Sequence, residues 1–159
     1  MIKCILENGH EASFRHVTAD VIVVNEKNEI LLVKRASNLV NGGRYAIPGG
    51  FVDRNETVSQ AGVREVLEET GYEVELLLLL RVADNPDRAQ EDRQNIGFFY
   101  VGKLKGGEHS LNSEVSEIGW FKLTQLPNKD QFAFDHYETI QLYIKYLEKK
   151  FTVPVFGKI

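Results

Sequence analysis

Hydrophobic residues in this chain gather in short runs that alternate with polar, glycine-containing segments. β-branched and aromatic residues dominate these runs, which is typical of strands. A polar break at Asn25–Glu29 separates two of the runs and predicts a hairpin. The predicted strands are Ile2–Leu6, Val17–Val24, Ile30–Val33, Glu73–Ala83, Asn95–Lys103 and Glu114–Lys122. We expect Glu73–Ala83 to be buried on both faces because its centre is continuously apolar.

Two further segments have the apolar spacing of amphipathic helices. The first is Thr57–Thr70, with Leu67 among the residues expected on its core-facing side. It is followed by Gly71, a residue type that readily ends helices. The second runs from Asp135 to about Lys149, and Asp135 with Glu138 resembles a capping box at its start.

Strands around one internal and one terminal helix predict an α+β fold with an α/β/α layered arrangement, a sandwich. A chain of 159 residues has the size of one domain, so we expect residues 1–159 to form a single domain. Polar loops are predicted at Ala36–Gly43, Asp84–Arg93 and Lys105–Ser113, and Phe151–Ile159 is a tail without an assigned structure. Asp84–Arg93 is longer than most hairpin connections, which favours a role in binding.

The helix predicted at Thr57–Thr70 carries a concentration of acidic residues. Glu65, Glu68 and Glu69 fall within an arc of roughly 100° on one face, where like charges repel. A solvated acidic surface is the simplest interpretation. The alternative is a metal site, because a glycine turn at Gly49–Gly50 exposes backbone carbonyls and a hard divalent cation takes several oxygen ligands.

Composition limits the classes of function. The net charge of −4 provides no basic surface, so we expect no nucleic-acid polymer as a partner. The single cysteine, Cys4, excludes an internal disulfide and a cysteine-rich zinc site, and a reducing, cytoplasmic location fits. No targeting segment is visible, and the apolar run Leu76–Leu80 is far too short to span a membrane, so we expect no membrane partner.

The stretch Gly50–Tyr72 resembles the signature of the Nudix hydrolases residue by residue. The matching positions are Gly50, Glu56, Arg64, Glu65, Val66, Glu68, Glu69, Gly71 and Tyr72. Only Tyr72 departs from the pattern, by replacing an aliphatic residue with an aromatic one. The resemblance extends over most of the chain and implies the Nudix fold, a mixed sheet between helices. It also implies hydrolysis of a pyrophosphate bond in a nucleoside diphosphate linked to another moiety, with Mg²⁺ or Mn²⁺ as cofactor.

The resemblance further implies a role for each residue of the box. Glu68 and Glu69 are expected to bind the metal, with the carbonyl group of Gly50 close by. Glu65 is either a further ligand or the residue that receives the proton of the attacking water. Arg64 is expected to hold Glu65 in place by a charge-assisted hydrogen bond.

Two other acids are given roles by the same resemblance. Glu56 is expected to brace the loop–helix–loop and not to touch substrate. Outside the box, Glu114 stands six residues before Trp120, as does an acid of some Nudix enzymes that completes the metal site or acts as the base. Glu117 and Glu108 are its rivals, and a plain surface charge remains open for each.

Substrate-binding residues are predicted among the basic side chains, because a phosphate substrate needs positive charge beside the acids. They are Arg35, Arg44, Arg88 and Arg93. Asp84–Arg93 resembles the proline- and arginine-bearing loop of ADP-ribose pyrophosphatases, and Phe132–His136 resembles a segment of the ADP-ribose-acting branch. Both favour ADP-ribose or a related small nucleotide as the substrate. His136 itself is expected at the surface, in the first turn of the helix.

Two alternative functions stay open. One is a nucleoside triphosphate pyrophosphohydrolase that removes damaged nucleotides, with the same chemistry and a different base pocket. The other is a Nudix-like sensor that binds ADP-ribose without cutting it, which the complete set of box acids disfavours. We also expect the exposed edge near the N-terminus to pair two subunits into a homodimer.

Overall fold

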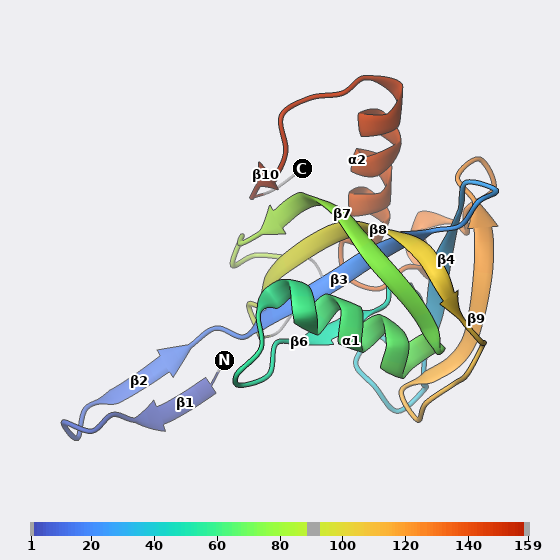
Figure 1. The fold of residues 1–159 in the computed structure, drawn as a ribbon. Coiled ribbons are helices and arrows are strands. Elements are labelled where there is room, and N and C mark those ends of the chain that lie inside the picture. The colour runs from blue at the N-terminus through green and yellow to red at the C-terminus, as the bar shows by residue number, and fades with distance from the viewer. Residues whose placement is uncertain (1, 89–92, 158–159) are drawn as a thin grey trace.

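The computed structural model describes residues 2–88 and 93–157, where a mixed β-sheet lies between two helices (Figure 1). The helices are α1 (Val58–Thr70) and α2 (His136–Glu148), and a 3₁₀ turn, η1, spans Lys129–Gln131. The strands are β1 (Ile2–Ile5), β2 (Glu11–Phe14), β3 (Val17–Val24), β4 (Glu29–Arg35), β5 (Tyr45–Ala46), β6 (Gly49–Phe51), β7 (Tyr72–Ala83), β8 (Ile96–Gly107), β9 (Val115–Lys122) and β10 (Val155–Phe156). The α+β fold expected from the strand and helix pattern is confirmed.

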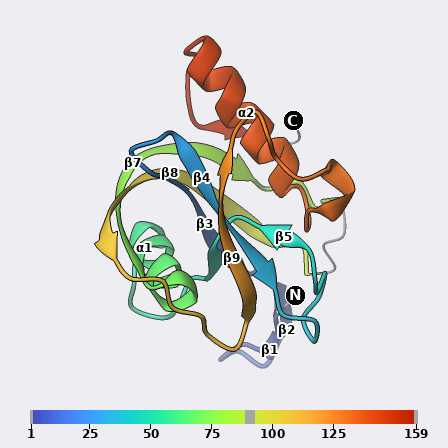
Figure 2. The same cartoon turned by 90° about the vertical axis from the view of Figure 1, so that its right-hand side faces the viewer.

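The main sheet divides at its centre. Its order is β10-β7-β8-β3-β4-β5, with β6 paired to β3 and β9 paired to β4 (Figures 1 and 2). β3 and β4 have one paired position, Val24↔Ile30, next to the turn that joins them. Farther along β3, Thr18–Asp20 pairs with β6 instead, and the backbone N–H of Val21 donates to the carbonyl of Pro48. The two strands therefore diverge, and residues 47–50 enter the space between them.

Side chains of β3 alternate between two hydrophobic cores, one on each face of the sheet. Ile22 packs in the core that includes Ile140 of α2. Val21 and Val23 point the other way and pack with Val66 of α1. Each of these side chains is almost completely buried, which stabilises the fold by about 1.5–3 kcal/mol per residue. Burial on both faces explains why β3 reads as a continuous apolar run.

The ends of α1 are set by local hydrogen bonds, and its end at Gly71 is where the sequence predicted it. The Thr57 hydroxyl accepts the backbone N–H of Gln60, and the Gln60 side chain accepts the N–H of Thr57, at 3.2 and 2.8 Å. Gly71 ends the helix in the left-handed region, with φ of 75°, and donates its N–H to the carbonyl of Leu67. The expectation that Leu67 faces the core is wrong, since 47% of it is exposed.

Two expectations for β7 and β8 need correction. Leu77 is 58% exposed, because the pairing of β7 with β8 shifts between Leu76 and Leu78 and turns Leu77 outward at a bulge. The loop expected from Lys105 begins later, since β8 continues to Gly107, which pairs with Tyr72. A Cβ on Gly107 would clash with the carbonyl oxygen of Gly71, so glycine is needed there for the close approach of the two backbones.

The capping box expected at the start of α2 does not form. Asp135 occupies the N-cap position, but its side chain makes no capping hydrogen bond. Its carboxylate instead pairs with Arg81 at 2.8 Å and Arg88 at 2.7 Å, and Glu138 pairs with Lys129 at 2.6 Å. A buried arginine needs a carboxylate partner more than a helix end needs a cap, because an uncompensated buried charge is far more costly.

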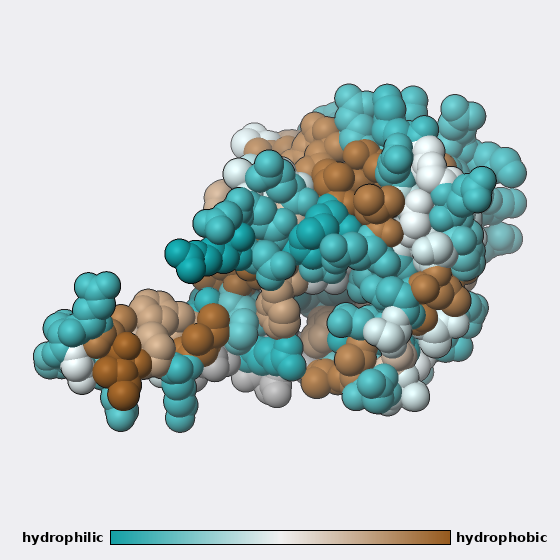
Figure 3. All heavy atoms as spheres, turned by 60° about the horizontal axis from the view of Figure 1, so that its bottom comes forward, coloured by the Kyte–Doolittle hydropathy of each residue, from teal (hydrophilic) through white to brown (hydrophobic). Residues whose placement is uncertain are grey.

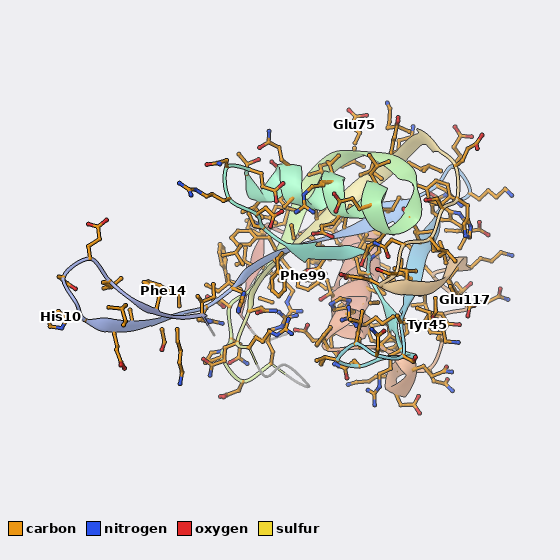
Figure 4. All side chains as sticks on the ribbon, turned by 90° about the horizontal axis from the view of Figure 1, so that it is seen from below. His10, Phe14, Tyr45, Glu75, Phe99 and Glu117 are labelled. Atoms are coloured by element: carbon orange, nitrogen blue, oxygen red, sulfur yellow. The ribbon has the colours of Figure 1, made fainter. Side chains whose placement is uncertain are left out.

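The N-terminal strand expected at Ile2–Leu6 forms as β1, but it pairs with β2 and not with the main sheet. This hairpin projects away from the rest of the described chain (Figures 1, 3 and 4). Ile2, Ile5 and Phe14 are 46%, 74% and 48% exposed on it. An apolar hairpin without a core beneath it is a candidate contact surface.

Part of the C-terminal tail has a structure that the sequence did not indicate. β10 pairs in parallel with β7 at Arg81 and Val82, which extends the main sheet by one short strand. In the described residues, no helix is both long enough and apolar enough to cross a membrane.

Candidate active site

A cavity of about 470 Å³ lies where β3 and β4 diverge. Its wall consists of Thr18, Asp20, Arg35, Leu39, Val40, Ile47, Gly49, Gly50, Phe51, Asp53, Glu65, Glu68, Arg88, Arg93, Asn95, Asn112, Glu114, Phe134 and His136. The cavity therefore brings together seven predicted site residues: Gly50, Glu65, Glu68, Glu114, Arg35, Arg88 and Arg93. The other four predicted residues, Glu56, Arg64, Glu69 and Arg44, are not in its wall.

At the turn formed by Gly49 and Gly50, the backbone lies very close to the side chains of Glu65 and Asp20. A Cβ on Gly50 would lie 2.5 Å from the carboxyl carbon of Glu65, and one on Gly49 would lie 2.8 Å from Oδ1 of Asp20. Any side chain at Gly50 would displace the Glu65 carboxylate. Glycine here creates the space in which that carboxylate sits.

Arg64 holds three carboxylates of the box. Its guanidinium donates to Glu56 at 2.7 and 3.0 Å, to Glu65 at 2.8 Å and to Glu68 at 2.9 Å. It also donates to the carbonyl of Phe51 at 3.0 Å, which ties α1 to β6. The predicted bond between Arg64 and Glu65 is therefore present. Glu56 accepts the N–H of the nearby turn in addition, and its hydrogen bonds with Arg64 lower its pKa to about 2.

Glu69 is turned inward from this group. It is 5% exposed, and its Oε2 accepts the backbone N–H of Gly49 at 3.0 Å. Burial raises the pKa of Glu69 to about 8, and the charges of Glu65 and Asp20 act in the same direction. Burial also raises the pKa of Glu65, against the opposing effect of Arg64. Both acids lie where a nearby cation would favour their charged form.

The oxygen atoms of this region fit a divalent cation in kind. Glu65 and Glu68 reach the cavity, and the Gly50 turn provides backbone oxygens without a side chain in the way. No three acidic, histidine or cysteine side chains in residues 2–88 and 93–157 are arranged to hold an ion. The carboxylates of Glu65 and Glu68 accept hydrogen bonds from Arg64, and that of Glu69 accepts one from the backbone N–H of Gly49.

Of the three acids considered outside the box, Glu114 is the one in the cavity wall. It precedes β9, and its charge adds to the effects of burial and Glu68 in raising the pKa of Glu65. Glu117 lies at the periphery of the molecule and pairs with Lys34 at 3.3 Å (Figure 4). Glu108 lies beside the turn that ends α1.

The four predicted arginines occupy different environments. Arg35 and Arg93 line the cavity, and each packs over an aromatic ring of its wall, Phe134 at 5.4 Å and Phe51 at 5.5 Å. Arg88 is 8% exposed and paired with Asp135, and Arg44 donates to the carbonyl of Phe132 at 3.4 Å. The remainder of the predicted binding loop, residues 89–92, lies outside the described residues.

Asp20 and His136 are among the wall residues that were not predicted. Asp20 is a charged residue within the apolar run of β3, and such a charge inside a buried strand is the signal that could have found it. The expected surface position of His136 is wrong, since His136 is 4% exposed and packs against Phe99. Burial raises the pKa of Asp20 to about 7 and lowers that of His136 to about 3.

Comparison with known proteins identifies the family of this chain. Residues 14–143 match the model of the NUDIX domain family. An ADP-ribose pyrophosphatase of Methanocaldococcus jannaschii is 37% identical over 124 residues, covering 78% of this chain and 70% of the relative. A putative 8-oxo-dGTP diphosphatase of Bacillus subtilis is 37% identical over 110 residues, covering 69% and 68%.

The fold has solved counterparts as well. A NUDIX hydrolase from Nitrosomonas europaea superposes with a TM-score of 0.79 at 22% identity, covering 99% of this chain and 93% of that one. The box residues, the fold and the match over residues 14–143 lead to one conclusion: this chain belongs to the NUDIX family and is a Nudix hydrolase.

Proposed function

We propose that the protein hydrolyses a pyrophosphate bond in a nucleoside diphosphate linked to another moiety, with ADP-ribose as the favoured substrate and Mg²⁺ or Mn²⁺ as cofactor. The observation that carries this proposal is the Arg64-centred group, in which Glu65 and Glu68 face a cavity that Glu114 also lines. The 37% identity to an ADP-ribose pyrophosphatase supports the substrate.

Each residue has a task in this reaction. A bound divalent cation would neutralise phosphate charge, with Glu65, Glu68, Glu69 and Gly50 as its proposed ligands. Glu65 or Glu114 receives the proton of the attacking water. The water oxygen bonds to one phosphorus as the bridging P–O bond breaks, so ADP-ribose yields AMP and ribose 5-phosphate.

Substrate binding is assigned to the arginines and aromatic rings of the wall. Arg35 and Arg93 provide positive charge for the diphosphate, each already oriented over a ring. Phe51 and Phe134 lie at the cavity with exposed ring surface on which a base can stack. Arg44 lies outside the wall and acts indirectly, because its guanidinium donates a hydrogen bond to the carbonyl of Phe132 and holds the backbone there.

The test is product release from a panel of substrates with Mg²⁺, with a chelator as control. The panel contains ADP-ribose, NADH, diadenosine polyphosphates, sugar nucleotides, and normal and oxidised nucleoside triphosphates. Chelator-sensitive release of AMP from ADP-ribose is the expected result. Preferred cleavage of an oxidised triphosphate would favour the second candidate, pool sanitising, which the identity to the Bacillus subtilis relative supports. Binding of ADP-ribose without cleavage of any substrate would indicate a sensor.

We also propose that the protein acts in the cytoplasm as a homodimer joined through the β1–β2 hairpin. The register places Ile2 opposite Phe14 and Cys4 opposite Ala12, so these four side chains share one face. The opposite face holds polar Lys3, Ser13 and Glu11, together with the exposed Ile5. A two-stranded ribbon is marginal in water, and the same apolar face of a second copy would cover it.

A further inference from the structure

The inner end of the cavity holds polar side chains that the proposed reaction does not use. Asp20, Arg88 and His136 are 6%, 8% and 4% exposed, and all three contribute to the cavity wall. They come from β3, from the segment after β7 and from the start of α2. Buried polar groups of this kind are costly unless they have partners, so their bonds decide what the site can bind.

The bonds of His136 determine which of its nitrogens carries a proton. Nδ1 accepts the backbone N–H of Ile47 at 3.0 Å, so Nδ1 is unprotonated and Nε2 carries the hydrogen. Nε2 is 3.8 Å from Oδ1 of Asp20, which is beyond a normal hydrogen bond. Because burial lowers the pKa of His136 to about 3, the ring is neutral and Nε2–H is a neutral donor.

Arg88 contributes a second donor. Arg88 pairs with Asp135 at 2.7 Å, and the same carboxylate pairs with Arg81 at 2.8 Å, so the two guanidinium groups share one negative charge. Nε of Arg88 is buried and has no hydrogen-bond partner among the described residues. Asp20 contributes acceptors. Among the described residues, its carboxylate accepts a long hydrogen bond of 3.5 Å from the Thr18 hydroxyl, so it can accept further hydrogen bonds.

This combination of donors and acceptors matches hydroxyl groups. A hydroxyl donates and accepts, so it can satisfy Asp20 on one side and His136 or Arg88 on the other. A phosphate mainly accepts hydrogen bonds, so it would leave the acceptor oxygens of an ionised Asp20 without a donor. Of the two rings proposed for a base, Phe134 lies 5.5 Å from the ring of His136, so the base is assigned to Phe51, which is 38% exposed.

The position of Asp20 indicates how far these hydroxyls are from the scissile bond. Asp20 pairs with Gly49 across β3 and β6, and Ala19 pairs with Gly50, the residue that cradles Glu65. The hydroxyl site is therefore next to the turn at which the diphosphate is expected. A sugar bonded directly to a phosphate can reach it, whereas a base attached beyond that sugar lies farther away.

We propose that Asp20, Arg88 and His136 bind the hydroxyl groups of the sugar on the phosphate farther from the nucleoside, the terminal ribose of ADP-ribose. This inference rests on the proposed function and makes these residues the determinants of specificity for a diphosphate with a second sugar. A nucleoside diphosphate that ends in a bare phosphate would leave them unsatisfied.

The experiment compares binding of ADP-ribose and ADP, which differ by that ribose. Calorimetry is carried out with Mg²⁺ on Glu65→Gln protein, which lacks one of the two candidate proton acceptors and should slow turnover, with and without a second substitution. Asp20→Asn keeps the shape of the side chain, and His136→Asn keeps an acceptor for Ile47 while removing Nε2–H. Glu117→Gln, an exposed acid outside the cavity wall, is the matched control. Far-ultraviolet circular dichroism establishes that each variant is folded.

The expected result is that Glu65→Gln protein binds ADP-ribose at least about tenfold tighter than ADP. Asp20→Asn and His136→Asn should each remove most of this preference while leaving ADP affinity unchanged, and Glu117→Gln should alter neither. Equal losses for both ligands, or no preference at the outset, would overturn the assignment. If the unsubstituted chain still hydrolyses ADP-ribose, only this inference fails. If it neither binds nor hydrolyses ADP-ribose, the proposed function fails first.

Discussion

Arg64 is the residue on which the geometry of the acidic group depends, because one guanidinium contacts three carboxylates and a backbone carbonyl. It offsets the repulsion that Glu65 and Glu68 would otherwise have at helical spacing. The acids of the box therefore differ in environment, and substitutions should separate function from stability at each position.

Glu68→Gln should reduce kcat by at least about 100-fold with Mg²⁺, because a carboxylate proposed to bind the cation is lost. Its side chain is 55% exposed, so the free energy of unfolding should change by less than about 0.5 kcal/mol. Enzyme assays and urea denaturation measure the two quantities, with Glu117→Gln as the control. A comparable loss of stability and activity would show that Glu68 is structural.

Gly50→Ala should displace the Glu65 carboxylate, because the added Cβ would lie 2.5 Å from its carbon. We expect more than about tenfold loss of kcat and a decrease of about 1–3 kcal/mol in unfolding free energy. Gly106→Ala is the matched control, since its nearest neighbour, Oε2 of Glu73, is at 3.8 Å. If Gly50→Ala and Gly106→Ala lost equal activity and equal stability, Gly50 would not be the residue that makes room for the Glu65 carboxylate.

His136 predicts a pH dependence of stability. Burial lowers its pKa from 6.5 to about 3, so between these values the unfolded chain binds more protons than the native one. The contribution of His136 is complete above pH 6.5 and is lost as the pH falls, by about 2 kcal/mol at pH 5. Asp20, whose pKa burial raises to about 7, has the opposite slope.

Comparing the unsubstituted protein with His136→Asn isolates the contribution of His136 to the pH dependence of stability. Between pH 7.5 and pH 5, the unsubstituted protein should lose about 2 kcal/mol relative to the variant in urea unfolding. If the unfolding free energies of the two proteins changed in parallel with pH, His136 would bind its proton over the same pH range in the native state as in the unfolded chain.

At the scale of elements, α1 is positioned by its ends and by Arg64. Thr57 and Gln60 cap its start, Gly71 ends it, and Arg64 ties it to β6 through Phe51. α2 is different, because Asp135 at its start pairs with buried arginines of other segments. The first helix is specified locally and the second through long-range contacts.

Thr57→Ala should lower the unfolding free energy by about 1 kcal/mol, because the N–H of Gln60 loses its acceptor. Thr57→Ser keeps the hydroxyl and should restore most of the stability. Denaturant midpoints measure both variants. An alanine variant as stable as the serine variant would show that this cap contributes nothing.

At the scale of the whole molecule, the β1–β2 hairpin stands apart from the two cores (Figures 1 and 3). Its apolar face has no cover among the described residues, which is the reason to expect a second copy. The expectation that residues 1–159 form a single domain stays a prediction.

Phe14→Glu should convert a dimer into a monomer, because it places a charge on the apolar face proposed as the contact. Ser13→Glu adds the same charge on the opposite face of the hairpin and should leave the dimer intact. Sedimentation velocity distinguishes the species. A monomeric unsubstituted protein would rule out this contact.

The sequence alone determined the features that depend on near neighbours. The end of α1 at Gly71 and the glycine turn at Gly49 and Gly50 follow from residues close in sequence, whereas the Arg64–Glu65 bond was implied by the resemblance of the box. The strands were found because apolar runs of β-branched residues reflect burial. The length of β8 was underestimated because its final glycines are typical of a loop. The burial of Leu77 was predicted wrongly because a bulge turns its side chain outward.

Only the tertiary structure decided which distant residues meet. Oδ1 of Asp20 and Nε2 of His136 are 3.8 Å apart although the two residues lie far apart in sequence. Asp135 pairs with Arg81 and Arg88 in place of capping its helix. These contacts arise because β3 and β4 diverge and α2 closes the space between them. No local spacing encodes such a meeting, since it depends on the free energy of packing the whole sheet and satisfying the charges buried within it.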